Sequence, residues 1–206
     1  SWLWDGTRPV VVIEPDGDIV VIGVGNRYRS DDGIGHRVLD ELAAEVLVAE
    51  SHPQPSRLQR VRLCWSDGEA ARLIEEWRGA ELAVVVDAVV AGDEPGTVRL
   101  FEAGVEDLPV RPGTSSHATG VGEAWALAGA LDARPGRLVV VGVEPAVLDD
   151  GTELTPLVSA AVPCALRLVR TALALAPTLT TAQAHQPAVP GPPLNGPTTR
   201  EVIQPP

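Results

Sequence analysis

The sequence has few of the residues that several common kinds of active site require. Its 206 residues include no Met and no Lys, since all 16 basic residues are Arg. Without Lys, the chain cannot form the phosphate-binding loop of a Walker-type nucleotide site. Cys64 and Cys164 are its two cysteines, and they are too far apart in sequence to form the C-x-x-C pair of a redox or zinc site. Two isolated thiols predict a reducing, cytoplasmic setting.

Positive charge and long hydrophobic runs are also scarce. The formal net charge is −12, which argues against a nucleic-acid partner because affinity for phosphate backbones comes from clustered cations. No uninterrupted apolar stretch reaches the roughly 18 residues that a membrane span needs, and no secretory leader is recognisable. We therefore expect no membrane partner. The 45% hydrophobic content is typical of a folded domain.

The central part of the chain alternates between strand and helix patterns. The runs DIVVIGVG, LAVVVDAVV and RLVVVGVEP are continuously apolar, as in strands that are covered on both faces. Ile34, Val38, Leu42 and Val46 recur every four residues and predict a helix over about 33–48. Further strands are predicted in RLQRVRLCW and GTVRLFEA, and further helices in EAARLIEEW, GEAWALAGALDA and PLVSAAVPCALRLVRTALALA. This alternation predicts an α/β fold with a mostly parallel sheet between helices.

Three regions can be distinguished along the chain. Residues 1–18 form an N-terminal extension, in which Pro15-Asp16-Gly17-Asp18 predicts a hairpin turn leading into the first core strand. Residues 19–176 form the main domain. Residues 177–206 are rich in proline and offer few apolar groups, so we expect this tail to be disordered.

Candidate site residues occur where the predicted strands end. Asp31 and Asp32 follow the first core strand, Asp87 lies near the end of LAVVVDAVV, and His117 precedes a predicted helix. In an open parallel sheet, ligands bind beyond the carboxyl ends of the strands. Two carboxylates and one imidazole suit a first-row divalent cation. We predict that Asp32, Asp87 and His117 contact one metal ion, while Asp31 caps the helix or orients the loop.

Each of these residues also has a structural interpretation. Asp32 could instead be the helix N-cap, and a lone histidine such as His117 is more often part of a loop or core. His36 is placed on the polar side of the first helix and given no role. Glu144, at a predicted strand end, and the pair Asp149–Asp150 are likewise given none.

Other chemistries lack their motifs. Gly23 and Gly25 end the first strand, but Tyr28 stands where a dinucleotide fingerprint has its third glycine. Neither the G-x-S-x-G nucleophile elbow nor the H-E-x-x-H zinc motif is present. A nucleotide-binding domain that has lost its fingerprint remains an alternative.

Four motifs together resemble the hydrogenase maturation endopeptidases, which process the large subunit of nickel–iron hydrogenases. They are VIGVGNRYRSDDGIG, VVVDAVVAGDEPGTV, TSSHATGVGEA and VVVGVEPAVLDDGTELTP. Their order and spacing agree with that family over roughly residues 19–175. The resemblance implies a three-layer α/β sandwich with a twisted, mostly parallel five-stranded sheet and helices on both faces.

The resemblance also implies an activity and a site. The activity is removal of a C-terminal extension from the large-subunit precursor after nickel insertion, which makes that precursor the partner. The metal-contacting residues fall on Asp32, Asp87 and His117; Asp32 and Asp87 are also candidates for catalysis. The nickel would come from the substrate, with no organic cofactor. We expect a cytoplasmic monomer. The alternative is a non-catalytic nickel-binding checkpoint or chaperone for hydrogenase assembly.

Overall fold

The computed structural model describes residues 3–4, 9–10, 19–50, 61–104 and 120–175. The strands among them are β1 (Leu3–Trp4), β2 (Pro9–Val10), β3 (Ile19–Val24), β4 (Val61–Ser66), β5 (Leu82–Ala88), β6 (Val98–Glu102) and β7 (Arg137–Val143). The helices are the 3-10 helix η1 (Ser30–Gly33) and the α-helices α1 (Ile34–Glu50), α2 (Ala70–Trp77), α3 (Val121–Ala130) and α4 (Pro156–Ala174).

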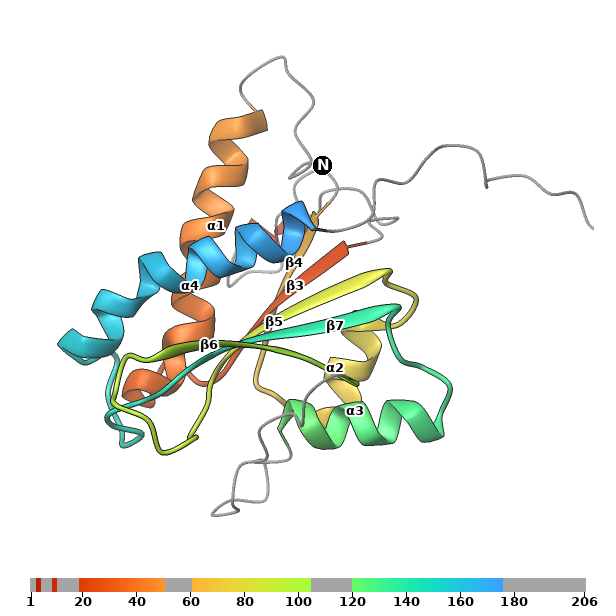
Figure 1. Cartoon of the computed structure of the whole chain (residues 1–206). Helices are drawn as coiled ribbons and strands as arrows, with labels where there is room; N and C mark the ends of the chain where they lie inside the picture. Colours follow the sequence, from red (N-terminus) through yellow and green to blue (C-terminus); the bar gives the residue numbers. More distant parts are fainter. Residues whose placement is uncertain (1–2, 5–8, 11–18, 51–60, 105–119, 176–206) are drawn as a thin grey trace, which may run out of the picture. The chain divides into compact units, whose positions relative to one another are not determined.

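The five longer strands form one sheet in the order β4-β3-β5-β7-β6 (Figure 1). β4, β3, β5 and β7 run parallel to one another, and β6 pairs with β7 in the antiparallel direction. The predicted five-stranded, mostly parallel sheet is therefore confirmed. Because parallel strands share one direction, the carboxyl ends of β3, β4, β5 and β7 lie at the same edge of the sheet.

Both faces of the sheet are covered by helices. In β5, Leu82, Val84 and Val86 pack in a core with residues of α1 and α4, whereas Ala83 and Val85 pack in a second core with residues of α2 and α3. Every residue of β5 is buried. A strand that is covered on both sides needs apolar residues at consecutive positions, which explains the continuous runs in the sequence.

α4 is long and apolar enough, by length and composition alone, to cross a membrane. Its residues Val158, Val162, Leu166 and Val169 recur on one side of the helix and belong to the core that α4 shares with α1 and the sheet. This packing is that of a core helix in an α/β domain.

The N-terminal residues differ from the prediction. Leu3 pairs with Val10 and Trp4 with Pro9 in a short antiparallel ladder between β1 and β2. β3 has β4 on one side and β5 on the other, both parallel, so the predicted antiparallel hairpin with β3 as its second strand is wrong. The turn residues 15–18 and the tail 177–206 lie outside the described residues, and the disorder of the tail stays a prediction.

Candidate functional site

Buried polar side chains gather at the carboxyl edge of the sheet. Those buried in the described part of the chain are Asp31, Asp32, His36, Ser66, Asp87 and Glu144. Each belongs to, or closely follows, the carboxyl end of β3, β4, β5 or β7. Burying a polar group is unfavourable unless it gains partners, so this concentration of six residues marks the edge as the candidate site.

The loop after β3 is shaped around Asp32. Gly25 has a φ of +129°, and a Cβ atom there would lie 1.8 Å from the main-chain oxygen of Asp32, so only glycine fits. The Oδ2 atom of Asp32 accepts a hydrogen bond from the N–H of Asn26 at 3.0 Å. The Oδ1 atom of Asn26 accepts one from the N–H of Tyr28 at 2.9 Å. Gly25 and Asn26 therefore fix the conformation of this loop.

Asp31 joins this loop to the segment after β7. Its Oδ2 atom accepts hydrogen bonds from the N–H groups of Ala146 and Val147, both at 2.9 Å. The main chain and hydroxyl of Thr155 donate to Asp31 at 2.7 and 3.0 Å. Asp31 therefore orients loops, one of the two roles predicted for it, and its hydrogen bonds reach the start of α4 rather than that of α1.

Asp87 lies at the same edge on the next strand. It is the penultimate residue of β5 and is 6% exposed. Val86 and Ala88 face the α1–α4 side, so alternation along the strand directs Asp87 to the α2–α3 side. η1, which contains Asp32, contacts β5. The structure thus brings these two predicted carboxylates to one edge, on segments that touch.

The third predicted ligand, His117, lies outside the described residues. Within 19–50, 61–104 and 120–175, no three His, Cys, Asp or Glu side chains are grouped closely enough to hold a metal ion. Convergence of His117 with Asp32 and Asp87 stays a prediction.

The placement of His36 on a polar helix face is wrong. His36 is 9% exposed, and its Nε2 atom lies 3.0 Å from the main-chain oxygen of Ser66, at the end of β4. Its Nδ1 atom accepts a hydrogen bond from Nε of Arg27 at 3.1 Å. A carbonyl oxygen only accepts, so Nε2 is the donor in the hydrogen bond to Ser66. No signal in the sequence linked His36 to Ser66.

Arg27 fastens the loop after β3 to α1. Its guanidinium makes two hydrogen bonds to the carboxylate of Asp40, at 2.6 and 2.7 Å. Trp65 of β4 donates its indole N–H to the same carboxylate at 3.0 Å. Burial alone would raise the pKa of Asp40, but the hydrogen bonds and charge of Arg27 outweigh burial and lower it. Arg27, which follows Asn26 in the chain, is therefore held in a fixed position.

Glu144 has a structural role that the sequence did not reveal. Its Oε2 and Oε1 atoms accept hydrogen bonds from the main-chain N–H groups of Ala91 and Gly92, at 2.7 and 3.3 Å. This carboxylate therefore holds the loop that follows β5, just beyond Asp87.

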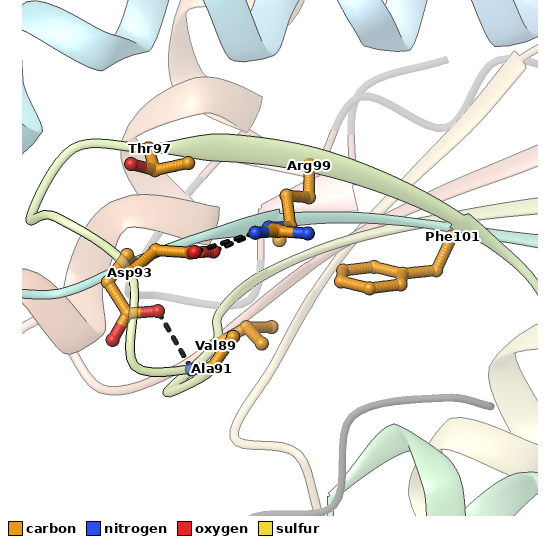
Figure 2. A pocket seen from close by; sticks show the side chains of 8 residues that line it. Val89, Ala91, Asp93, Thr97, Arg99 and Phe101 are labelled. Atoms are coloured by element: carbon orange, nitrogen blue, oxygen red, sulfur yellow. Dashed lines mark hydrogen bonds and ion pairs between the residues drawn. The ribbon is translucent and has the colours of Figure 1, made fainter. Parts of the chain in front are cut away.

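A small pocket lies beside this loop, where Asp93 and Arg99 face each other (Figure 2). Its lining residues are Val89, Ala91, Asp93, Thr97, Arg99, Phe101, Gly142 and Glu144. Its volume of about 10 Å³ holds roughly one water molecule. The pocket is too small for a peptide substrate and is a small gap between the loop after β5 and strands β6 and β7.

Cys64 is unsuited to be a nucleophile. Burial, together with the neighbouring Glu76, raises the pKa of its thiol to about 12. The reactive form of cysteine is the thiolate, which Cys64 does not form near neutral pH. We therefore assign Cys64 no chemical role at this edge.

The sequence is similar to those of known proteins. Residues 68–172, which contain Asp87 and His117, match the family HycI, hydrogenase maturation protease. The hydrogenase expression/formation protein HupD of Thiocapsa roseopersicina is 33% identical over 145 residues, which cover 68% of this chain and 61% of that protein. HoxM of Azotobacter vinelandii, also a hydrogenase expression/formation protein, is 31% identical over 155 residues, covering 73% of this chain and 70% of that one. The chain belongs to the hydrogenase maturation protease family.

The fold agrees with this membership. The hydrogenase maturating endopeptidase HybD of Escherichia coli superposes with a TM-score of 0.62 at 26% identity, covering 76% of this chain and 91% of HybD. The chain spans less than two thirds of the length of HupD. In this member of the hydrogenase maturation proteases, the carboxyl edge holds both Asp32 and Asp87.

Proposed function

We propose that this protein is an endopeptidase that removes the C-terminal extension of a nickel–iron hydrogenase large-subunit precursor after nickel has been inserted. Family membership supports the class of reaction. The observation that carries the proposal is the pair of buried carboxylates, Asp32 and Asp87, 5% and 6% exposed on adjoining segments of one sheet edge.

Nickel in this proposal is part of the substrate. Asp32, Asp87 and His117 would contact the ion where it already sits in the precursor. Oxygen and nitrogen ligands suit a first-row divalent cation. A cation bound beside both carboxylates would be attracted by each of them in its ionised form. The arrangement therefore favours a precursor that carries its metal over one that does not.

Hydrolysis then requires a positioned peptide and a water molecule. Asp32 or Asp87 accepts a proton from the water molecule while the oxygen of that water attacks the scissile carbonyl carbon. The C–N bond breaks, and the proton passes to the departing amine. Positioning and general-base catalysis contribute on the order of several kcal/mol to lowering the barrier. The rigid loop around Asp32, fixed by Asn26, supplies the positioning.

The test is a processing assay on purified precursor with and without nickel. We expect the wild-type protein to shorten only the nickel-loaded form, and Asp32→Ala, Asp87→Ala and His117→Ala each to abolish shortening. Glu45→Ala is the matched control, since Glu45 forms a surface ion pair with Arg170 on the outer side of α1.

Two results would contradict the proposal. Equal cleavage of nickel-free precursor would remove nickel recognition, and full activity of the three variants would place the site elsewhere. If the protein binds nickel-loaded precursor but does not shorten it on prolonged incubation, the protein is instead a non-catalytic nickel checkpoint.

A further inference from the structure

Four large apolar side chains are exposed on the loops around the candidate site. They are Tyr28, Val90, Val147 and Leu157, with exposed fractions of 70%, 44%, 39% and 60%. We name these four residues the apolar rim. Tyr28 follows β3, Val90 follows β5, Val147 follows β7, and Leu157 is the second residue of α4, so the four lie in or directly after the connections at the carboxyl edge.

The main chain of the apolar rim is fixed by hydrogen bonds. The C=O of Tyr28 accepts from the N–H of Gly151 at 2.9 Å, and its N–H donates to the side chain of Asn26. Val147 is bound twice by Asp31: its C=O accepts from the Asp31 N–H at 3.1 Å, and its N–H donates to the Asp31 carboxylate at 2.9 Å. These side chains are therefore exposed on an ordered frame rather than on a loose loop.

The other two rim residues are joined to the same frame. Leu157 is the second residue of α4 and lies two residues after Thr155, which is bound to Asp31. A Cβ atom on Gly96 would lie 2.7 Å from the main-chain oxygen of Leu157, so the loop after β5 packs directly on the start of α4. Val90 precedes Ala91, whose N–H is held by Glu144. Buried Asp31 and Glu144 thus connect three loops that each expose apolar side chains.

A rigid frame that keeps apolar groups in water is a feature of protein-binding surfaces. Isolated exposed apolar residues are ordinary, but a group of them around a site marks a place where a partner binds. Binding to a surface that is already ordered loses less conformational entropy. The polar network at this edge therefore serves a contact surface as well as the candidate site.

The charges on the same loops limit the kind of partner. Exposed acidic residues on these connections are Glu94, Asp149, Asp150 and Glu153, in a chain with a formal net charge of −12. A second copy of this chain would bring like charges together, and nucleic acid or anionic lipid would be repelled. The complementary partner is a protein surface with an apolar centre and flanking Arg or Lys residues.

We propose that the apolar rim is the docking surface for the metalloprotein precursor, and that it binds an apolar patch flanked by cations beside the metal-bearing segment. This inference rests on the proposed function, because the partner is the same precursor. It adds that affinity for the folded precursor comes largely from residues that contact neither the nickel nor the scissile peptide.

Substitutions at matched positions on one helix test this inference. Leu157 is the second residue of α4 and Leu175 is its C-cap residue, and the two are 60% and 67% exposed. We expect Leu157→Ser and Tyr28→Ser each to raise KM for nickel-loaded precursor by about tenfold with kcat unchanged, because the metal-contacting residues are intact. Leu175→Ser should leave both constants unchanged. Asp149→Asn/Asp150→Asn should reduce the dependence of KM on ionic strength.

A direct affinity measurement with intact precursor, by calorimetry, separates the two proposals. If the wild-type protein never cleaves the precursor but binds it, and Leu157→Ser weakens binding, the proposed function fails and the docking surface stands. If the wild-type protein cleaves the precursor and the rim variants keep its KM, the docking surface is wrong and the proposed function stands. The docking proposal would also be overturned if Leu175→Ser raised KM as much as Leu157→Ser does. It would likewise be overturned if the wild-type protein formed a dimer that the rim variants dissociate.

Discussion

The two edges of the sheet differ in the groups that connect their loops and strands. At the amino edge, the described connections are main-chain hydrogen bonds, from the N–H of Gly136 to Ala80 and from the N–H of Arg137 to Glu81, both at 2.9 Å, and the partly exposed ion pair of Arg137 with Glu102. At the carboxyl edge, the buried carboxylates of Asp31 and Glu144 also accept hydrogen bonds from main-chain N–H groups of other loops. Apolar packing stabilises both edges through the same two cores.

This difference sets the candidate site apart from the rest of the fold. A buried charged group seldom stabilises a fold more than a well-packed apolar residue of similar size. The amino edge shows that the connections of this sheet can form without buried charged side chains. The polar groups of the carboxyl edge therefore serve the site and its loops, and substitutions there should separate activity from stability.

The largest expected effect is at Asp87. We predict that Asp87→Asn lowers precursor processing by more than about 1,000-fold, because a neutral amide is a poor ligand and a poor base. The free energy of unfolding should change far less than processing does, since Asn has nearly the same size as Asp and is also polar. Single-turnover processing and urea unfolding measure the two quantities. If Asp87→Asn loses activity only because less of the protein is folded, the contrast between the two edges is contradicted.

Asp31 should show the opposite behaviour to its neighbour Asp32. We predict that Asp31→Ala lowers the free energy of unfolding by about 3 kcal/mol, because the N–H groups of Ala146, Val147 and Thr155 lose their acceptor. Asp32→Ala should abolish processing with a smaller change in stability. Urea titrations of both variants make the comparison, and equal destabilisation would show that Asp32 is also structural.

Most of the fold could be predicted from the sequence because its strands are buried on both faces. Continuous apolar runs such as that of β5 have few other interpretations. The direction of β6 was not predicted, because its five residues are partly exposed and strand pairing is not local. The hairpin before β3 failed for the same reason: the turn signal at 15–18 is local, whereas β3 pairs with β4 and β5.

The candidate site was predicted in part. Asp32 and Asp87 stood out as carboxylates at the ends of apolar strands, and both lie at the carboxyl edge. His36 and Glu144 were missed because their partners, Ser66 and the loop at Ala91 and Gly92, come from other elements. A sequence shows that a side chain is polar, but it does not show which distant main-chain groups will surround it.

A smaller effect is expected from acid at Asp40. Arg27 lowers the pKa of this carboxyl in the folded protein, so the pair stabilises the fold above the ordinary pKa of aspartate and ceases to do so as pH falls through the lowered value. Asp40→Asn should remove that part of the pH dependence. Because the two side chains are 29% and 41% exposed, the change should stay below about 1 kcal/mol. Urea unfolding from pH 7 down to pH 3 measures it.

The smallest effect is expected at the amino edge. Arg137 and Glu102 form an ion pair at 3.0 Å with side chains 35% and 37% exposed, and exposed pairs of this kind contribute between about 0 and 1 kcal/mol. We predict that Arg137→Met changes the free energy of unfolding by less than about 1 kcal/mol and leaves processing unchanged, since nothing at this edge contacts the proposed substrate. Unfolding in low and high salt should differ little between variant and wild type. A marked loss of processing by Arg137→Met would show that the amino edge also serves function, and the contrast between the two edges would no longer hold.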